Sequence, residues 1–382
     1  MNDTNKLFVE LIRVAISTQD VLSIAPSVQD WKVLYEMAKK QSLVGICFAG
    51  VRKTFSHSPY RSPDSEQASG EDPSAIGMPE MLYLTWMGMA AKIQQRNEQM
   101  NEYTKKVLAH FREKGFPCTS LKGQGIARLY ASLSGLRQSG DVDVWISGGR
   151  KNLYLHTIKM YGYLGSLTYH HIAYPYIEDC EVEAHIWPSF LSSPFRNHRL
   201  QVYFKHHEPV DGCDDVPCLA FNRVFILLHC YQHFTRRGVG LRQILDYFFV
   251  LRASYEISNK DYKADSMNMI STLGMKRFAE AMMWIMKDIF GLEDKYLLCE
   301  PNERYGKFLL GEVMQTGNMG HSDERVDKKQ LQSAFGRFWN NLKRDIRIMN
   351  ICPHEALWEP LWGIYQFAWC KLTLLKYKRS NL

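Results

Sequence analysis

Two aspartates stand two positions apart in the stretch SGDVDVWI, residues 139–146, which otherwise has the pattern of a buried strand. Because successive side chains of a strand point to opposite faces, Asp141 and Asp143 share one face, with Cα atoms roughly 7 Å apart. Like charges so placed repel each other unless a positive group lies between them. The pair therefore predicts a site for cations.

A second acidic stretch, CEVEAHIW at residues 180–187, also has the pattern of a strand and places Glu181, Glu183 and His185 on one face. An isolated Asp-x-Asp is more often a solvated strand end, but three carboxylates on neighbouring strands are what a two-metal site requires. Mg²⁺ prefers such oxygen ligands and leaves positions for water and phosphates. The alternation alone does not choose between the two glutamates.

A glycine turn, LKGQG at residues 121–125, lies between a short strand and a helix, ahead of the aspartates. Backbone N–H groups at such a turn can approach a phosphate closely and point at it. Lys122 and Arg137 could add positive charge for a triphosphate, although each is as often a surface cation. The turn by itself is a weak signal and gains weight from the aspartates that follow.

Together these motifs carry a family resemblance. They are LKG at 121–123, Leu129-Tyr130, Arg137, GDVDV at 140–144 and Glu-x-His-x-Trp at 183–187. In this combination the chain resembles the bacterial uncharacterised nucleotidyltransferase family, part of the DNA polymerase beta-like nucleotidyltransferase superfamily. The resemblance extends from the helix around Trp31 to the later Gly-x-x-Leu-Arg-x-x-x-Asp stretch.

The resemblance implies an α+β fold, a small mixed β-sheet core with extensive flanking α-helices, that binds a nucleoside triphosphate, with ATP expected, and two Mg²⁺ ions. Asp141 and Asp143 match the metal-binding pair, and the family's third carboxylate, two residues before the histidine, selects Glu183. The implied phosphate-binding residues are Lys122, Gly123, Gln124, Gly125 and Arg137.

The expected reaction moves a nucleoside monophosphate from the triphosphate to an acceptor hydroxyl, and the sequence does not name the acceptor. One departure matters, because the superfamily usually has Gly-Ser or Gly-Gly at the phosphate turn and this chain has Gly-Gln-Gly. The hydroxyl that often touches a phosphate is absent. A non-catalytic nucleotide-binding or adaptor module with a degenerate site is therefore the alternative hypothesis.

Periodicity and turn residues predict the elements around these motifs. Helices are expected at 5–17, 30–52, 80–114, about 124–133, 149–161 and 221–252, and over most of 261–314 and 331–380. Strands are expected at 117–121, 139–146, 169–177 and 180–187, the last two as a hairpin. Three regions follow: N-terminal helices at 1–100 with a mobile linker at 54–79, the core at 101–220, and C-terminal helices at 221–382.

Histidines form several further patterns. His229 and His233 stand four apart on a predicted helix, but Cys230 replaces the glutamate of zinc proteases. They are expected either as a core pair or as a wall of the active cleft, without stoichiometric zinc. The doublet His170-His171 has no partners at ligand spacing and is expected to be solvated. Arg242 and Asp246 also stand four apart and are expected to pair on their own helix.

Composition sets the limits of the chain. It has 382 residues, a net charge of +7 and nine scattered cysteines without a Cys-x-x-Cys pair. The cysteines and the lack of a secretory signal pattern favour a cytoplasmic protein. The apolar stretch at 356–375 contains Glu359, Pro360 and Lys371, which predicts a buried or interfacial helix and no membrane span. The mild charge does not favour nucleic acid as a partner.

Overall fold

The computed structural model describes residues 3–56, 72–257, 262–320, 323, 325 and 332–379. Most of the predicted linker, residues 57–71, lies outside the described residues. Near its end, Pro73–Ile76 form the short 3₁₀ helix η2, which Asp72 caps by accepting a hydrogen bond from the backbone of Ser74.

The chain is an α+β protein built around one four-stranded mixed sheet, as predicted. The strand order is β1-β2-β4-β3, with β2 and β4 parallel and the other two pairs antiparallel. The strands are β1 (Cys118–Leu121), β2 (Val142–Ile146), β3 (His171–Ala173) and β4 (Val182–His185). The predicted β3–β4 hairpin is confirmed, although both strands are shorter than predicted.

The two faces of the sheet differ in character. Alternate residues of β2, among them Val142 and Val144, pack with β4 and with α4 in one hydrophobic core. Asp143 and Trp145 point to the other face, because side chains alternate along a strand. Trp145 stacks on Phe221, with ring centroids 5.4 Å apart. The face that bears Asp143 is therefore covered by the helices that follow the sheet.

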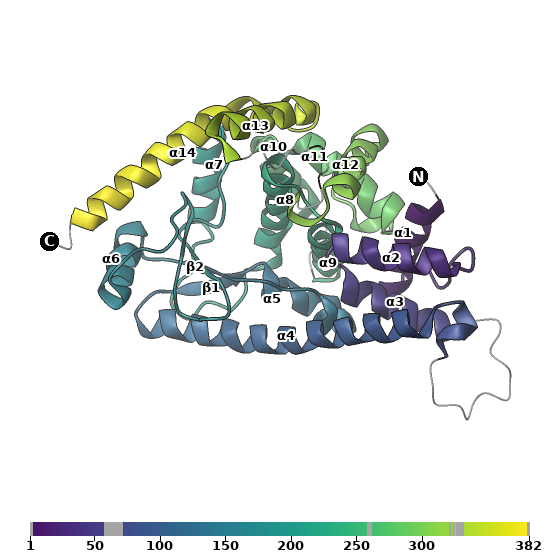
Figure 1. Cartoon of the computed structure of the whole chain (residues 1–382). Helices are drawn as coiled ribbons and strands as arrows, with labels where there is room; N and C mark the ends of the chain where they lie inside the picture. Colours follow the sequence, from purple (N-terminus) through teal and green to yellow (C-terminus); the bar gives the residue numbers. More distant parts are fainter. Residues whose placement is uncertain are drawn as a thin grey trace.

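Helices surround the sheet on both sides (Figure 1). Their bounds are α1 Asp3–Ala15, α2 Val28–Lys40, α3 Val44–Ser56, α4 Glu80–Glu113, α5 Gly123–Ala127, η3 Arg128–Leu136, α6 Arg150–Tyr161, α7 Pro194–Lys205, α8 Leu219–Arg236, α9 Leu241–Ile257, α10 Tyr262–Thr272, α11 Lys276–Trp284, η4 Ile285–Ile289, η5 Asp294–Tyr296, α12 Glu303–Thr316, η6 Asn318–Gly320, α13 Ala334–Ile348 and α14 Pro353–Arg379. The long α4 runs along one side of the molecule and α14 along the opposite side, with the sheet and α8 between them.

Two predicted helices are divided in the structure. The pattern at 30–52 forms α2 and α3, which are separated at Ser42, a non-glycine residue with a φ of 55°. The helix expected at about 124–133 forms α5 and η3, with a break at Ala131, whose φ is 50°. Apolar spacing continued through both breaks, so the sequence pattern did not mark them.

The C-terminal helix α14, predicted to be buried or interfacial, is not buried along its whole length. Several of its large apolar side chains are exposed, and they include Leu357, Leu361, Ile364, Phe367 and Leu372. Within the described residues, no helix has the length and apolar character needed to cross a membrane. Of the two predicted arrangements, a buried or an interfacial helix, the exposed side chains exclude burial of the whole helix. Hydrophobic composition alone does not say which face of a helix finds a packing partner.

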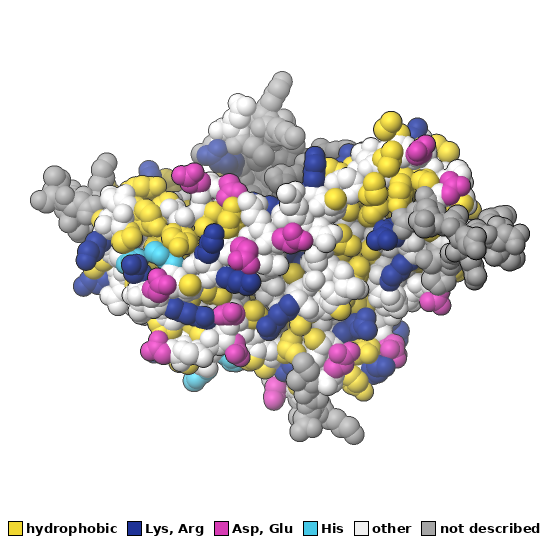
Figure 2. Space-filling view, turned by 90° about the horizontal axis from the view of Figure 1, so that it is seen from below, with side chains coloured by type: hydrophobic (Ala, Val, Ile, Leu, Met, Phe, Trp, Pro, Cys, Tyr) yellow, Lys and Arg dark blue, Asp and Glu magenta, His cyan; other side chains and the backbone are white. Residues whose placement is uncertain are grey.

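The face seen from below the view of Figure 1 carries basic and acidic side chains in an interspersed arrangement (Figure 2). Exposed ion pairs such as Lys105–Glu102 on α4 contribute to this mixture. On this face, the described residues form no continuous basic stripe of the kind that tracks a nucleic-acid backbone.

Candidate functional site

The centre of the site is a pair of carboxylates on neighbouring parallel strands. In the β2–β4 register, Asp143 lies directly opposite Glu183. Asp143 is 3% exposed, whereas Glu183 is partly buried. The predicted juxtaposition of the two acidic strands is therefore present, and the parallel pairing brings together residues far apart in the chain.

Lys122 supplies the positive charge that the paired acids require. Its Nζ lies 2.8 Å from Asp143 Oδ1. Burial lowers the pKa of Lys122, but the charges of Asp143, Glu183 and Asp141 outweigh burial and raise it. The lysine thus stays protonated on the floor of the site and offsets the repulsion between the carboxylates.

The backbone at Lys122 is held in an unusual conformation, with φ at 49° and ψ at −140°. This left-handed φ is strained for a residue with a Cβ atom and is typical of functional turns. Gly123 follows with a φ of +37°, so two consecutive residues turn the chain sharply out of β1. In this conformation the Lys122 side chain reaches Asp143 on the neighbouring strand β2.

His185 joins the two carboxylates from the same strand face. Its Nε2 lies 2.9 Å from Asp143 Oδ1 and 3.1 Å from Glu183 Oε2. Burial lowers the pKa of His185, but the hydrogen bonds to Asp143 and Glu183 outweigh burial and raise it. Burial likewise raises the pKa of Glu183, whereas the hydrogen bond and charge of His185 and the charge of Lys122 hold it well below its usual range.

Asp141 stands at the mouth of the site, one residue before β2 begins, and is exposed to solvent. The nearby charge of Asp143 is the main cause of its raised pKa, followed by the partial loss of hydration that neighbouring protein atoms impose. Lys122 and Arg242 act in the opposite direction. Asp141 and Asp143 therefore repel each other as the sequence pattern predicted, and a further cation would relieve that repulsion.

His170 and His171 belong to the site, which corrects the prediction that they are solvated. Both are partly buried, and His171 Nδ1 lies 3.4 Å from Glu183 Oε2. One ring nitrogen from each of His170, His171 and His185 lies within 4.8 Å of the others. Spacing along the sequence missed this trio because the β3–β4 pairing, which sets His171 opposite His185, creates it.

The paired histidines of α8 lie near enough to Lys122 for its charge to act on them. The ring centroids of His229 and His233 are 4.4 Å apart. Burial lowers the pKa of both imidazoles, that of His233 to about 3, and the charge of Lys122 lowers it further. Within the described part of the chain, neither histidine belongs to a close trio of metal-ligating side chains.

The side chain of Gln124 ties the glycine turn to α4 and points away from the carboxylates. Its Nε2 donates to Asn101 Oδ1 at 2.7 Å and to the Asn97 carbonyl at 3.1 Å, and its Oε1 accepts from Ser139 Oγ at 2.6 Å. Gly125 is tightly packed, because a Cβ there would lie 3.0 Å from a methyl group of Val216, which would have to shift by a few tenths of an ångström. Both residues hold the turn in place.

Arg137 forms a buried ion pair with Asp246, the residue for which the sequence predicted Arg242 as the partner. Its Nε and Nη2 donate to the two carboxylate oxygens of Asp246 at 2.6 and 2.7 Å. Tyr130 Oη donates to the same carboxylate at 2.7 Å. The predicted pairing of Asp246 with Arg242 on their own helix is replaced by this pair, while Arg242 donates to the Gln138 carbonyl at 3.0 Å.

The buried pair bears on the phosphate-binding role predicted for Arg137. The guanidinium is 2% exposed, and its remaining Nη1 lies 3.2 Å from Ser139 Oγ, the hydroxyl that bonds to Gln124. This arrangement supports a positioning role, since a chain of hydrogen bonds runs from Asp246 through Arg137 and Ser139 to the glycine turn.

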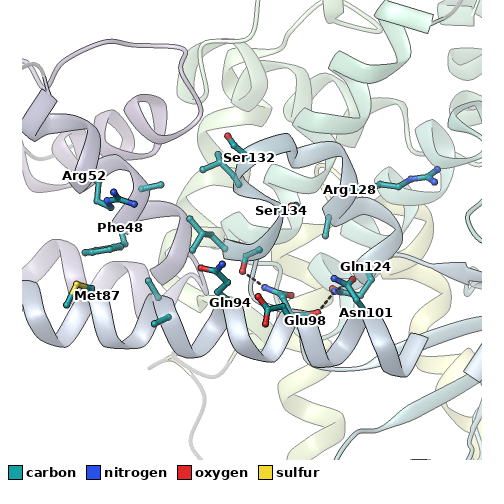
Figure 3. Close-up of a pocket in the computed structure, with 18 of the residues that line it drawn as sticks. Phe48, Arg52, Met87, Gln94, Glu98, Asn101, Gln124, Arg128, Ser132 and Ser134 are labelled. Atoms are coloured by element: carbon teal, nitrogen blue, oxygen red, sulfur yellow. Dashed lines mark hydrogen bonds between the residues drawn. The ribbon is translucent and has the colours of Figure 1, made fainter. Parts of the chain in front are cut away.

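A cavity of about 920 Å³ adjoins the turn on the side of α4 (Figure 3). Gln124 and Asn101 lie at one end of it and Phe48 and Met87 at the other, with Glu98 between them. The carboxylates Asp143 and Glu183 do not line this cavity. Its nearest link to the acidic site is Gln124.

Comparison with known protein families shows which family the chain belongs to. The family model for uncharacterised nucleotidyltransferases matches residues 27–291, more than half of the sequence. The chain belongs to the uncharacterised nucleotidyltransferase family. No curated protein and no solved structure matched it. The matched part of this nucleotidyltransferase family member contains the glycine turn, both acidic strands, α8 and α9, and it ends before α12.

The sequence patterns of this nucleotidyltransferase family member did not indicate which side chains contact its carboxylates. Lys122 was proposed only for phosphate, although it contacts Asp143, and His185 was used only as a landmark for Glu183. The alternation along β4 already placed His185 on the acidic face. That signal could have identified it as a site residue.

Proposed function

We propose that this protein transfers a nucleoside monophosphate from a nucleoside triphosphate, with ATP as the expected donor, to the hydroxyl of an acceptor. The observation that carries the proposal is the pairing of Asp143 with Glu183 across parallel strands, beside Lys122 at the end of the glycine turn. Family membership supports the same reaction class.

The donor set fits the divalent cations that such a reaction needs. Asp141, Asp143 and Glu183 are oxygen ligands of the kind that Mg²⁺ prefers. The raised pKa of Asp141, caused first by Asp143, reflects excess negative charge at one place. When bound, Mg²⁺ would polarise the phosphoryl oxygens and offset charge on the leaving pyrophosphate.

The residues of the chain itself take distinct roles in this proposal. Lys122 forms an ion pair with Asp143. Once cations neutralise the carboxylates, the ammonium group of Lys122 would also contact the triphosphate. His185 holds Asp143 and Glu183 in register through its Nε2. Arg137 and Ser139 keep the turn in position from behind. The acceptor oxygen would form a bond to the α-phosphorus as the bond to pyrophosphate breaks.

Nucleotide turnover and nucleotide binding should be measured separately. Each α-³²P-labelled triphosphate is incubated with Mg²⁺, the protein and a cell lysate, and transfer of label and release of pyrophosphate are followed. We expect label on an acceptor with the wild type, and a loss of at least about a hundredfold in Asp141→Asn and in Asp143→Asn.

Circular dichroism and thermal melting show whether each variant is folded. Unchanged turnover in both folded variants would refute the two-metal site. Triphosphate binding by the wild type without any transfer or pyrophosphate release would instead support the non-catalytic module that the Gly-Gln-Gly turn suggested.

A further inference from the structure

We propose that His170, His171 and His185 form a binding site for a transition-metal dication of the Zn²⁺ class. This site lies beside the Asp141–Asp143 carboxylates and takes a different kind of ion from the Mg²⁺ of the proposed reaction. It does not depend on the proposed function, because it rests on the imidazole geometry alone.

The three imidazoles lie close enough together to share one ion. One ring nitrogen from each lies within 4.8 Å of the others, and His171 Nδ1 lies 3.2 Å from His170 Nε2. Ligands about 2.1 Å from a common ion are separated by about 3.0 Å in an octahedral sphere and about 3.4 Å in a tetrahedral one. The separation between the His170 and His171 nitrogens falls in this range.

The imidazoles are also oriented as metal ligands usually are. Thr168 Oγ1 lies 3.3 Å from His170 Nδ1, which leaves His170 Nε2 to face the trio. Such a hydrogen bond to the far ring nitrogen commonly fixes the orientation of a ligating histidine. The Thr168 hydroxyl also accepts from the backbone N–H of His171 at 3.1 Å, so one residue orders both histidines.

One buried nitrogen of the trio has no hydrogen-bond partner. His185 is 1% exposed, and among the residues that the structure describes no group bonds to its Nδ1. A buried polar atom without a partner is costly, and a bound ion would supply a partner at this place.

The donor type selects the ion. Three imidazole nitrogens with a fourth position open are a ligand set for Zn²⁺ and related borderline ions, whereas Mg²⁺ prefers oxygen ligands. His185 belongs both to this trio and to the close group that it forms with Asp143 and Glu183, which sets the imidazole site next to the carboxylate site. We therefore expect two adjacent sites that differ in ion preference.

Metal binding is tested on the full-length protein without nucleotide. The protein is stripped with a chelator and titrated with Zn²⁺ by calorimetry and with Co²⁺ by visible absorption, in the presence of excess Mg²⁺. We expect one Zn²⁺ per chain and the d–d absorption of Co²⁺ bound to nitrogen ligands. His171→Ala and His170→Gln should each weaken Zn²⁺ binding by at least about a hundredfold, the upper range for a lost supporting contact.

Two variants serve as controls in the same experiment. His229→Ala changes a histidine outside the trio and should keep the Zn²⁺ affinity, in line with the expectation that the α8 pair holds no zinc. Asp141→Asn should also keep Zn²⁺ while it loses the proposed nucleotide turnover. The two proposals therefore fail independently.

Zn²⁺ binding that is absent in the folded wild type would overturn the proposal. So would binding that disappears in His229→Ala and persists in His171→Ala. Thermal melting of each variant without metal confirms that a loss of binding does not come from unfolding.

Discussion

The buried pair between Arg137 and Asp246 gives a prediction whose size follows from its geometry. Both residues are at most 3% exposed, and the Asp246 carboxylate accepts three hydrogen bonds of 2.6–2.7 Å. Asp246→Asn keeps the shape but removes the charge, so the Arg137 guanidinium remains buried without a counter-ion. Breaking such a pair from one side costs about 3–5 kcal/mol.

This loss is a large share of the roughly 5–15 kcal/mol that stabilises a typical protein. Urea unfolding followed by tryptophan fluorescence measures it, and the chain has nine tryptophans as probes. As a matched control, Glu102→Gln breaks the exposed pair with Lys105 and should leave the unfolding midpoint unchanged.

The double variant Arg137→Met with Asp246→Leu tests whether the lost stability comes from a lone buried charge or from the loss of the ion pair itself. If the cost comes from a lone buried charge, replacing both partners by apolar side chains should recover most of the lost stability. A loss below about 1 kcal/mol in Asp246→Asn, or a double variant no more stable than the single one, would refute this reasoning.

Two further predictions concern single carboxylates. Glu183→Gln should lower nucleotide turnover by at least about a hundredfold, and the exposed Glu181→Gln should cost much less; a more damaging Glu181→Gln in the same assay would mean that the third carboxylate is misassigned. Burial raises the pKa of Asp345 to about 6 despite the nearby Arg344. As the pH rises from about 4 to about 6 and this carboxyl loses its proton, the wild type should therefore lose stability. Relative to the wild type, Asp345→Asn should gain up to about 3 kcal/mol over that interval, and parallel melting curves against pH would contradict the assignment.

The order of elements and the acidic pair could be predicted from sequence because both depend on local patterns. Alternation placed Asp141 and Asp143 on one strand face, and the glycine turn and helix spacing fixed the elements around them. Glu183 needed the family resemblance, since Glu181 satisfies the same alternation. The register that sets Asp143 opposite Glu183 then confirmed that the two acidic strands meet.

The remaining features depend on contacts between distant parts of the chain. The partner of Asp246 is Arg137, more than a hundred residues away, whereas spacing on one helix pointed to Arg242. His170 and His171 had no ligand partners in sequence, because β3 and β4 must pair before His171 meets His185. The strain at Lys122 also has no sequence signature, since lysine is not a residue chosen for a positive φ.

The bond between Arg137 and Asp246 also has a consequence for the order in which the molecule can assemble. During synthesis the acidic strands leave the ribosome first, and domains generally begin to fold from the N-terminal side. Until α9 follows, Arg137 has no counter-ion, and burying it alone would carry the cost of an unpaired charge. The hydrogen bonds from Arg137 through Ser139 to the glycine turn therefore cannot form in their final state before then. A nascent chain with complete acidic strands would still lack a finished site, and the arrival of Asp246 would be the step that completes it.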